Sequence, residues 1–304
     1  MTKLALAIHG GAGTILRSQM TPALEAEYRG GLESALKVGW NLLENGGSSL
    51  DAVESSVCSL EDFPLFNAGR GAVFTHEGKV ELDAAIMDGH ALKAGAVTFV
   101  KNIKNPVKLA RLIMERTEHI LLAGEGANQF AEQMGVRTEP DEYFFTEHRW
   151  LQLQEALAND RVQLDHSFAK PIGTVGAVAC DVRGHLSAAT STGGMTNKKF
   201  GRVGDTAIIG AGTYADQTCA VSCTGHGEYF MLGATAYDVA VRMKYKNLTL
   251  IEAAQEAIDR LTAIDGEGGL IAVDNNGNVT LPFNSEGMYR GFRIDGQIEI
   301  NIYR

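Results

Sequence analysis

Residues 173–194 read GTVGAVACDVRGHLSAATSTGG, and this stretch decides the architecture of the second half of the chain. Residues 174–181 and 185–190 are rich in Val, Ala and Thr and flank Arg183-Gly184, so we expect a β-hairpin. The preceding residues, about 158–173, follow neither a helical nor a strand period and are predicted to be a polar linker. A buried strand therefore begins directly after a coil.

Strand and helix patterns extend from this hairpin towards both ends of the chain. Strands are predicted near residues 4–8, 72–75, 80–87, 95–100, 206–209, 219–223, 270–273, 278–281, 288–294 and 297–302. Helices are predicted near 22–44, 49–60, 106–116, 126–133, 147–157, 228–244 and 250–264. Because strands at both ends enclose helices, we expect an α/β fold in which sheets pack face to face beneath outer helical layers.

Composition indicates a globular protein, since 45% of the 304 residues are hydrophobic and 21% are charged. The net charge is −10, and no run of roughly five or six Lys/Arg occurs, so nucleic acid and anionic membranes are poor partners. The apolar stretch 4–8 is too short for a secretion signal, and we expect a cytoplasmic protein. The four cysteines (Cys58, Cys180, Cys219 and Cys223) form no Cys-x-x-Cys pair, which favours reduced thiols over a zinc site.

Two short motifs lack the context that their usual functions require. Residues 210–215 (GAGTYA) fit a loose dinucleotide fingerprint, but a strand-like segment follows where a phosphate-binding helix is needed. His9-Gly10-Gly11 is similar to a lipase oxyanion loop, yet the sequence has no Gly-x-Ser-x-Gly nucleophile elbow. We interpret His9-Gly10-Gly11 as a glycine turn after a buried strand.

Glycine and threonine are dense between residues 173 and 227. Such glycines let backbone N–H groups approach a ligand closely, and the hydroxyls add short hydrogen-bonding groups, as in an oxyanion or carboxylate site. The same residues are also usual in β-turns between core strands. Composition alone favours turns and leaves both interpretations open.

Longer segments in a fixed order resemble the plant-type L-asparaginase/isoaspartyl aminopeptidase family of N-terminal nucleophile hydrolases. They are GTVGAVACD, AATSTGGMTNK, GRVGD, GAGTYAD, SCTGHGE, GGLIAVD and LPFNSEGMYR, together with AIHGGAG, SLDAVE, PLFNAGRGAVFT, ELDAAIMDG, KAGAV and NPVKLARL in the first half. The resemblance implies a four-layer αββα sandwich formed by one domain, 1–304. It also implies self-cleavage into an α subunit (1–173) and a β subunit (174–304), and a dimer of such αβ units.

Residue roles follow from the resemblance position by position. It implies cleavage between Gly173 and Thr174, and makes Thr174 the nucleophile. The same comparison assigns a hydrogen bond to the nucleophile's hydroxyl to Thr192, the oxyanion hole to Thr224 and Gly225, the substrate's α-carboxylate and α-ammonium to Arg202 and Asp205, and a place near the active site to Asn67. If Arg202 and Asp205 only paired with each other on the surface, the contact would contribute about 0–1 kcal/mol.

A structural sodium ion is also implied, bound by backbone carbonyls of Leu60, Glu61, Phe63, Phe66, Ala68 and Arg70. Arg70 and His226 depart from the family pattern; His226 adjoins the oxyanion glycine and could act on substrate range.

The activity implied is release of L-aspartate from L-asparagine and β-aspartyl dipeptides through a threonine acyl-enzyme, without an organic cofactor. A threonine hydroxyl needs a base, and the α-amine freed by cleavage, with a pKa of about 7.7–8.0, can supply it. The alternatives are a glycosylasparaginase, a threonine endopeptidase of the same superfamily, and an unprocessed small-molecule binding protein without catalysis.

Overall fold

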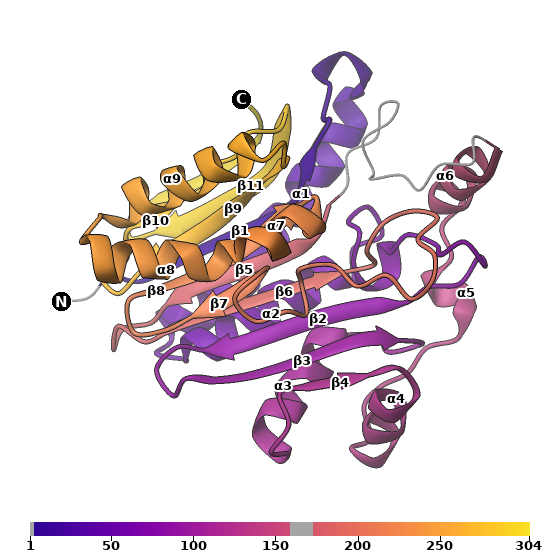
Figure 1. The fold of residues 1–304 in the computed structure, drawn as a ribbon, viewed down its shortest axis with the longest axis horizontal. Coiled ribbons are helices and arrows are strands. Elements are labelled where there is room, and N and C mark those ends of the chain that lie inside the picture. Colours follow the sequence, from indigo (N-terminus) through magenta and orange to yellow (C-terminus); the bar gives the residue numbers. More distant parts are fainter. Residues whose placement is uncertain (1–2, 159–172) are drawn as a thin grey trace.

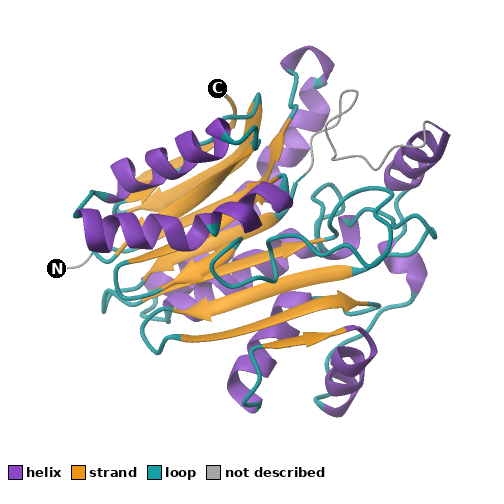
Figure 2. Ribbon diagram, in the orientation of Figure 1, coloured by secondary structure: helices purple, strands orange, loops and turns teal. Residues whose placement is uncertain are grey.

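A computed structural model describes residues 3–158 and 173–304 (Figures 1 and 2). The helices are α1 (Pro22–Glu44), α2 (Ser49–Glu61), α3 (Pro106–Arg116), α4 (Gly124–Gln133), α5 (Asp141–Phe144), α6 (Glu147–Ala158), α7 (Gly227–Gly233), α8 (Thr235–Lys246) and α9 (Leu250–Ala263). Short 3-10 turns occur at η1 (Arg17–Gln19) and η2 (Gly69–Gly71).

The strands form two sheets. The larger sheet has the spatial order β12 (Gln297–Tyr303), β11 (Gly287–Ile294), β1 (Ala5–Gly13), β5 (Val175–Cys180), β6 (Leu186–Thr192), β2 (Leu82–Asp88), β3 (Lys93–Val100) and β4 (Leu121–Ala123). The smaller sheet has the order β10 (Val279–Thr280), β9 (Gly268–Asp274), β8 (Cys219–Gly225) and β7 (Thr213–Ala215). All neighbouring strands run antiparallel except β3 and β4.

The two sheets pack face to face, and helices cover their outer faces (Figure 1). Strands β1, β5 and β6 contact β8 and β9 across an apolar interface that contains Ala5, Ala7, Val178 and Ile271. Helices α1, α2 and α3 pack on the far face of the larger sheet, and α8 and α9 pack on the smaller one. The expected mixed α/β fold is therefore present.

Local sequence signals place several helix ends correctly. Helix α1 begins at Pro22 because the Thr21 hydroxyl accepts a hydrogen bond from the Leu24 N–H at 3.2 Å, and proline suits the first helical position. Helix α9 begins with a capping box in which Thr249 and Glu252 satisfy each other's backbone N–H groups. Both helices were predicted from the sequence to within a residue of these bounds.

Four local predictions are wrong. Residues 72–75 and 206–209 form loops with only isolated bridges at Thr75 and Ile209. The helix expected over 228–244 breaks at Ala234, whose φ of 46° separates α7 from α8. Residues 10–13 extend β1 to Gly13 with a bulge between His9 and Gly11, so the glycine turn expected there is absent.

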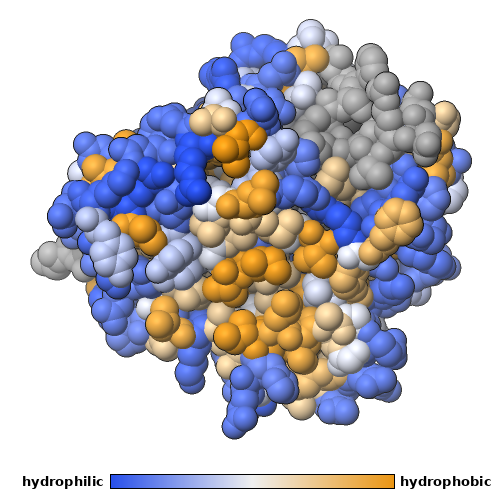
Figure 3. Space-filling view, viewed as in Figure 1, coloured by the Kyte–Doolittle hydropathy of each residue, from blue (hydrophilic) through white to orange (hydrophobic). Residues whose placement is uncertain are grey.

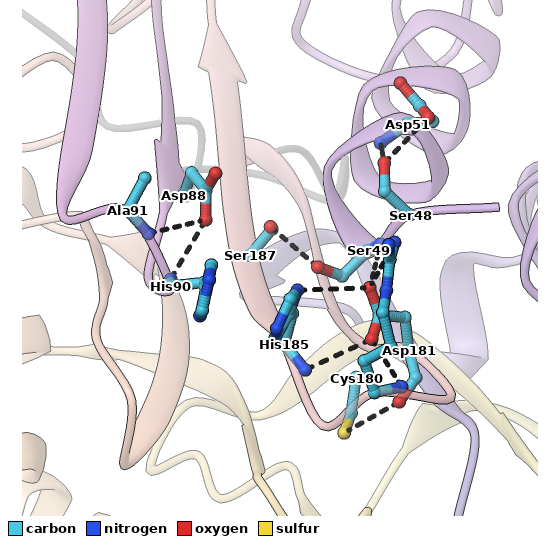
Figure 4. A network of polar contacts seen from close by, with 11 residues as sticks. Ser48, Ser49, Asp51, Asp88, His90, Ala91, Cys180, Asp181, His185 and Ser187 are labelled. Atoms are coloured by element: carbon cyan, nitrogen blue, oxygen red, sulfur yellow. Dashed lines mark hydrogen bonds and ion pairs between the residues drawn. The ribbon is translucent and has the colours of Figure 1, made fainter.

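The β5–β6 turn is closed by a buried carboxylate at the end of β5 opposite to Thr174 (Figure 4). Asp181 Oδ1 accepts the N–H groups of Arg183 and His185 at 2.8 and 3.1 Å. Its Oδ2 accepts the N–H of Ser49 at the start of α2, where the helix dipole favours negative charge. One side chain thus joins the predicted hairpin to the helix behind it.

None of the helices within the described residues is long and apolar enough to cross a membrane. The linker predicted over 158–173 lies almost entirely outside the described residues, since 159–172 are not described.

Two glycine substitutions should change stability in opposite directions. A Cβ at Gly95 in β3 would lie 1.9 Å from the Ala110 carbonyl oxygen in α3, whereas a Cβ at Gly30 in α1 would meet no atom within 4 Å. We expect Gly95→Ala to lower the free energy of unfolding by about 1–3 kcal/mol through overpacking. Gly30→Ala should raise it by about 0.5–1 kcal/mol because alanine favours helix. Urea unfolding of both variants checks this, and equal shifts would contradict the packing of α3 on β3.

Candidate active site

Thr174 immediately precedes β5. The neighbouring antiparallel strand β6 ends beside it, at Thr192. Its hydroxyl donates a hydrogen bond to Thr192 Oγ1 at 3.2 Å, and Thr192 Oγ1 also accepts the Gly194 N–H at 3.0 Å. Thr174 is 8% exposed and Thr192 is 3% exposed. The β5–β6 pairing therefore places the expected nucleophile and its expected hydrogen-bonding partner side by side.

Thr224 approaches the same point from the smaller sheet, near the end of β8. A Cβ on Gly173 would lie 2.6 Å from Thr224 Oγ1, so the hydroxyl sits against the Gly173 side of the Gly173–Thr174 bond. Thr224 Oγ1 accepts the Ala12 N–H at 3.2 Å. A hydroxyl whose oxygen accepts can still donate its proton, and such a donor can stabilise an oxyanion.

Gly225 and Gly268 face each other where β8 and β9 meet, with φ angles of 145° and 152°. A Cβ on Gly225 would lie 2.3 Å from the Glu267 carbonyl oxygen. Only glycine fits this conformation and spacing. The backbone beside Thr224 therefore has a conformation that requires glycine, and the expected oxyanion donor Gly225 lies in this segment.

Arg202 and Asp205 lie in the loop between β6 and β7 and converge on Gly227 at the start of α7. A Cβ on Gly227 would lie 2.7 Å from Asp205 Oδ1 and 3.1 Å from Arg202 Nη2. Arg202 donates two hydrogen bonds to Glu228, from Nε and from Nη2, each at 2.8 Å. Arg202 therefore pairs with Glu228, and the alternative of a surface pair between Arg202 and Asp205 is wrong.

Asp205 is a buried carboxyl group, 3% exposed, whose Oδ2 has no hydrogen-bond partner among the described residues. Burial raises its pKa to about 7, while the nearby Arg202 charge acts in the opposite direction. A buried carboxylate without a partner is costly. The position suits a ligand that brings a positive charge and hydrogen-bond donors.

Asn67 connects loops close to the site through both ends of its side-chain amide. Its Oδ1 accepts the Val73 N–H at 3.0 Å, its Nδ2 donates to the Gly194 carbonyl at 2.8 Å, and its own carbonyl accepts the Gly193 N–H at 3.1 Å. Asn67 is thus close to the site, as expected, but it supports the turn after Thr192.

Two residues near the site were not singled out in the sequence. Glu228 accepts the two hydrogen bonds of Arg202. In the sequence, only its place in the SCTGHGE segment could have indicated that Glu228 lies near the site. Lys198 is 2% exposed, and its Nζ donates to the Glu81 carbonyl at 3.1 Å. That Nζ lies 3.2 Å from the position of a Cβ on Gly194. Burial lowers the pKa of Lys198, and nearby Asp83 raises it.

His226 precedes α7 and points towards the Glu228 side of the loop. Its Nε2 lies 3.3 Å from Glu228 Oε2, and its ring packs edge-on against Tyr229 with centroids 4.7 Å apart. Burial lowers the pKa of His226, although the Glu228 charge raises it. His226 therefore belongs to the group of residues around Glu228.

Three threonine hydroxyls around the Gly173–Thr174 junction provide the chemistry of an amide-hydrolysing enzyme with a hydroxyl nucleophile. Residues 2–302 match the family model described as asparaginase. The chain is 51% identical to an isoaspartyl peptidase from Salmonella typhimurium over 100% of both chains. It is 50% identical to an isoaspartyl peptidase from Escherichia coli, covering 100% of this chain and 97% of the relative.

A probable isoaspartyl peptidase/L-asparaginase 2 from Arabidopsis thaliana is 40% identical over 98% of each chain. The chain belongs to this asparaginase family, and the family resemblance seen in the sequence is confirmed.

Replacing Asp205 with Asn should stabilise the fold in a pH-dependent way. The folded pKa of about 7 exceeds the ordinary value of 3.8, so charging the buried group costs stability as the pH rises between these values. Relative to the parent protein, Asp205→Asn should gain up to about 1.4 kcal/mol per pH unit from about pH 4 to pH 7 and no more above. Thermal unfolding from pH 4 to 8 measures this. A difference that is independent of pH would contradict the buried, unpaired state of Asp205.

Proposed function

We propose that this chain is an N-terminal nucleophile amidohydrolase. It cleaves itself between Gly173 and Thr174 and then releases L-aspartate from L-asparagine and β-aspartyl dipeptides. The observation that carries the proposal is the position of Thr174, which begins a central strand with its hydroxyl 3.2 Å from Thr192 Oγ1 and with Gly173 packed against Thr224. The names of the relatives, isoaspartyl peptidase and isoaspartyl peptidase/L-asparaginase, support the substrate class.

In self-cleavage, Thr174 Oγ1 attacks the Gly173 carbonyl carbon. The Gly173–Thr174 amide bond breaks, the nitrogen takes the hydroxyl proton, and an ester joins Gly173 to Thr174 Oγ1. Water then hydrolyses the ester to a Gly173 carboxylate and restores the hydroxyl. The freed α-amine can act as a base, which the amide nitrogen of the intact chain cannot do.

In turnover, the α-amine accepts the proton of Thr174 Oγ1 as this oxygen attacks the β-carbonyl of the substrate. The Thr224 hydroxyl and the Gly225 N–H stabilise the oxyanion, each contributing about 3–4 kcal/mol by analogy with other oxyanion holes. Ammonia or an amino compound leaves with the proton, and water releases aspartate from the ester. No organic cofactor takes part.

Substrate recognition rests on Arg202 and Asp205. Asp205 takes the α-ammonium, and its unpartnered Oδ2 supports this role. Arg202 takes the α-carboxylate through a bidentate contact of the kind it makes with Glu228. The substrate carboxylate therefore replaces or displaces Glu228.

The two sheets with their outer helices support a four-layer αββα sandwich of the N-terminal nucleophile hydrolase type. The smaller sheet contacts mainly β1, β5, β6 and β2, so it leaves β3 and β4 without this cover. Figure 3 shows apolar side chains gathered on the same face. Contiguous apolar surface supports association, and we assign this face to a dimer of αβ units.

A structural sodium ion suits the backbone of residues 60–70. Cβ atoms at Gly69 and Gly71 would lie 2.5 Å and 2.1 Å from the carbonyl oxygens of Glu61 and Phe66, so these oxygens point into the loop. Hard cations prefer such oxygen ligands. The Arg70 side chain lies over the Tyr143 ring, 5.4 Å from its centroid. The ion would stabilise the loop that carries Asn67.

The other candidate functions are less well supported. A glycosylasparaginase or a threonine endopeptidase of the same superfamily would share Thr174, but full-length relatives carry the isoaspartyl peptidase name. An unprocessed binding protein would have no use for a threonine hydroxyl directed at Thr192. A cytoplasmic location stays a prediction from the sequence.

Purified protein should mature into fragments of residues 1–173 and 174–304, whereas Thr174→Ala should stay whole because it lacks the attacking hydroxyl. A denaturing gel and N-terminal sequencing of the smaller fragment measure this. Thr75→Ala, which removes a buried threonine hydroxyl elsewhere, is the control and should still mature. A permanently intact parent chain would favour the binding protein, and a different new N-terminus would remove Thr174 as nucleophile.

Substrate choice should depend on the shape of the Arg202 contact. Arg202→Lys keeps the charge but loses the bidentate geometry, so kcat/KM on a β-aspartyl dipeptide should fall by about 10-fold or more. L-glutamine should be a poor substrate of the parent enzyme, because a misplacement of about 1 Å at the carbonyl can cost on the order of 100-fold. Arg242→Lys is the control, since Arg242 pairs with Asp238 on α8 and not with Glu228. Normal turnover by Arg202→Lys would contradict the recognition role.

A further inference from the structure

A chain of buried polar side chains runs behind Thr174 from β1 into the smaller sheet. His9 Nδ1 lies 2.8 Å from the Thr174 carbonyl oxygen, and His9 Nε2 lies 2.8 Å from Ser222 Oγ. Ser222 Oγ lies 2.8 Å from Thr190 Oγ1, which lies 2.6 Å from Thr213 Oγ1. All four side chains, His9, Ser222, Thr190 and Thr213, are fully buried.

The protons along this chain can be assigned from one end. A carbonyl oxygen only accepts hydrogen bonds, so His9 Nδ1 must carry a proton. Burial lowers the pKa of His9 to about 3, which keeps the ring neutral and leaves Nε2 without a proton. Nε2 then accepts the Ser222 proton, Ser222 accepts from Thr190, and Thr190 accepts from Thr213.

The opposite direction of proton donation, from His9 Nε2 towards Thr213, is disfavoured. It would run from a protonated Nε2 through the same hydroxyls to the Thr206 carbonyl, which lies 3.1 Å from Thr213 Oγ1. That arrangement requires either a buried imidazolium or a bare Nδ1 facing the Thr174 carbonyl at 2.8 Å. The Thr174 carbonyl therefore selects the Nδ1–H tautomer, and the hydroxyl chain supplies the proton donor that the bare, buried Nε2 needs.

Two glycines leave room for this arrangement. Gly176 pairs with His9 across β1 and β5, and a Cβ there would lie 2.0 Å from Ser222 Oγ and 2.4 Å from His9 Nε2. A Cβ at Gly11 would lie 2.3 Å from the Gly173 nitrogen. The His9-Gly10-Gly11 motif thus brings an imidazole to one side of the Gly173–Thr174 junction and lets the backbone approach the other side.

We propose that His9 is a positioning residue, whose Nδ1–H donates to the Thr174 carbonyl while Ser222, Thr190 and Thr213 hold the ring at Nε2, and that it thereby aims the Thr174 hydroxyl. The role in catalysis rests on the proposed function. After cleavage, Thr174 is attached to the chain only through its carbonyl side. The His9 bond holds that carbonyl, which is the remaining anchor of the residue, so it acts on turnover as well as on self-cleavage.

Two substitutions at His9 separate this role from simple support of the sheets. The amide nitrogen of Asn can take the place of Nδ1 and donate to Thr174, whereas the amide of Gln reaches the place of Nε2. We expect His9→Gln to lower kcat on a β-aspartyl dipeptide by about 100-fold with little change in KM, and His9→Asn to lower it by less than about 10-fold. Rates of self-cleavage should fall in the same order.

Ser222→Ala provides a second test that does not alter the imidazole. Loss of the Ser222 hydroxyl leaves the buried Nε2 without a donor and the ring without its anchor, so kcat and the rate of self-cleavage should fall by about 10-fold while KM stays unchanged. The matched control is Ser56→Ala, which removes an equally buried hydroxyl bonded to the Ala35 carbonyl outside the chain of hydroxyls. It should keep the parent rates even if its melting temperature falls.

Nitrogen-15 NMR of histidine-labelled Thr174→Ala protein reports the tautomer without catalysis. A neutral His9 with the proton on Nδ1 supports the proposal, and a proton on Nε2 overturns it. Equal kcat losses in His9→Gln and His9→Asn, or parent-like rates in Ser222→Ala, also overturn it. If the parent protein never matures, the proposed function fails while the NMR result still decides the tautomer.

Discussion

Two hydrogen bonds between the stacked sheets set the geometry on which the site depends. His9 and Ala12 of β1 contact Ser222 and Thr224 of β8, at 2.8 and 3.2 Å. Stacked sheets lie about 10 Å apart and usually meet through interdigitating apolar side chains, which lack the directional preference of hydrogen bonds. Breaking a hydrogen bond in an apolar interior so that one partner is left unsatisfied costs about 1–3 kcal/mol. These two bonds therefore resist sliding of one sheet against the other.

The same contacts explain the small residues around the junction. The interface contains Ala5, Ala7 and Ala12 on β1, and Gly11 and Gly176 have no room for a Cβ. Larger side chains would separate the sheets and draw Thr224 away from Gly173. The glycines and alanines that appear as turn residues or weak strand formers in the sequence are thus required by close approach.

The elements predicted best from sequence are those whose ends are set by local chemistry, such as α1 with Thr21 and Pro22. The segment 206–209 fails because its apolar residues pack as a loop onto β2 and β3, where Ala207 contacts Ala85 and Ala96. Periodicity cannot distinguish that packing from a strand. The left-handed conformation falls on Ala234, a residue type that rarely adopts it, and Gly233 at the end of α7 was the one nearby signal for the break.

The residues of the site also differ in how well the sequence predicted them. The family resemblance brought Thr174, Thr192 and Thr224 together, and the structure does place their side chains around one junction. The Arg202–Glu228 pair spans 26 residues and joins a loop to a helix, so spacing in the sequence carries no trace of it. Asn67 was predicted near the site, but only its three hydrogen bonds reveal that it supports a turn.

Arg202 has an oppositely charged partner in the structure, whereas Asp205 is less well compensated. On the proposed function, this difference determines which groups the substrate must supply. Arg202 already has a carboxylate partner in Glu228, so a substrate carboxylate exchanges one bidentate contact for another. Replacing the Glu228 carboxylate with a substrate carboxylate contributes little net free energy to binding. Asp205 Oδ2 has no hydrogen-bond partner in the part of the chain that the structure describes, and burial disfavours the charge of this carboxyl group. A substrate ammonium relieves that cost, so we infer that the amino group contributes more to affinity, while the carboxylate fixes the orientation of the head group.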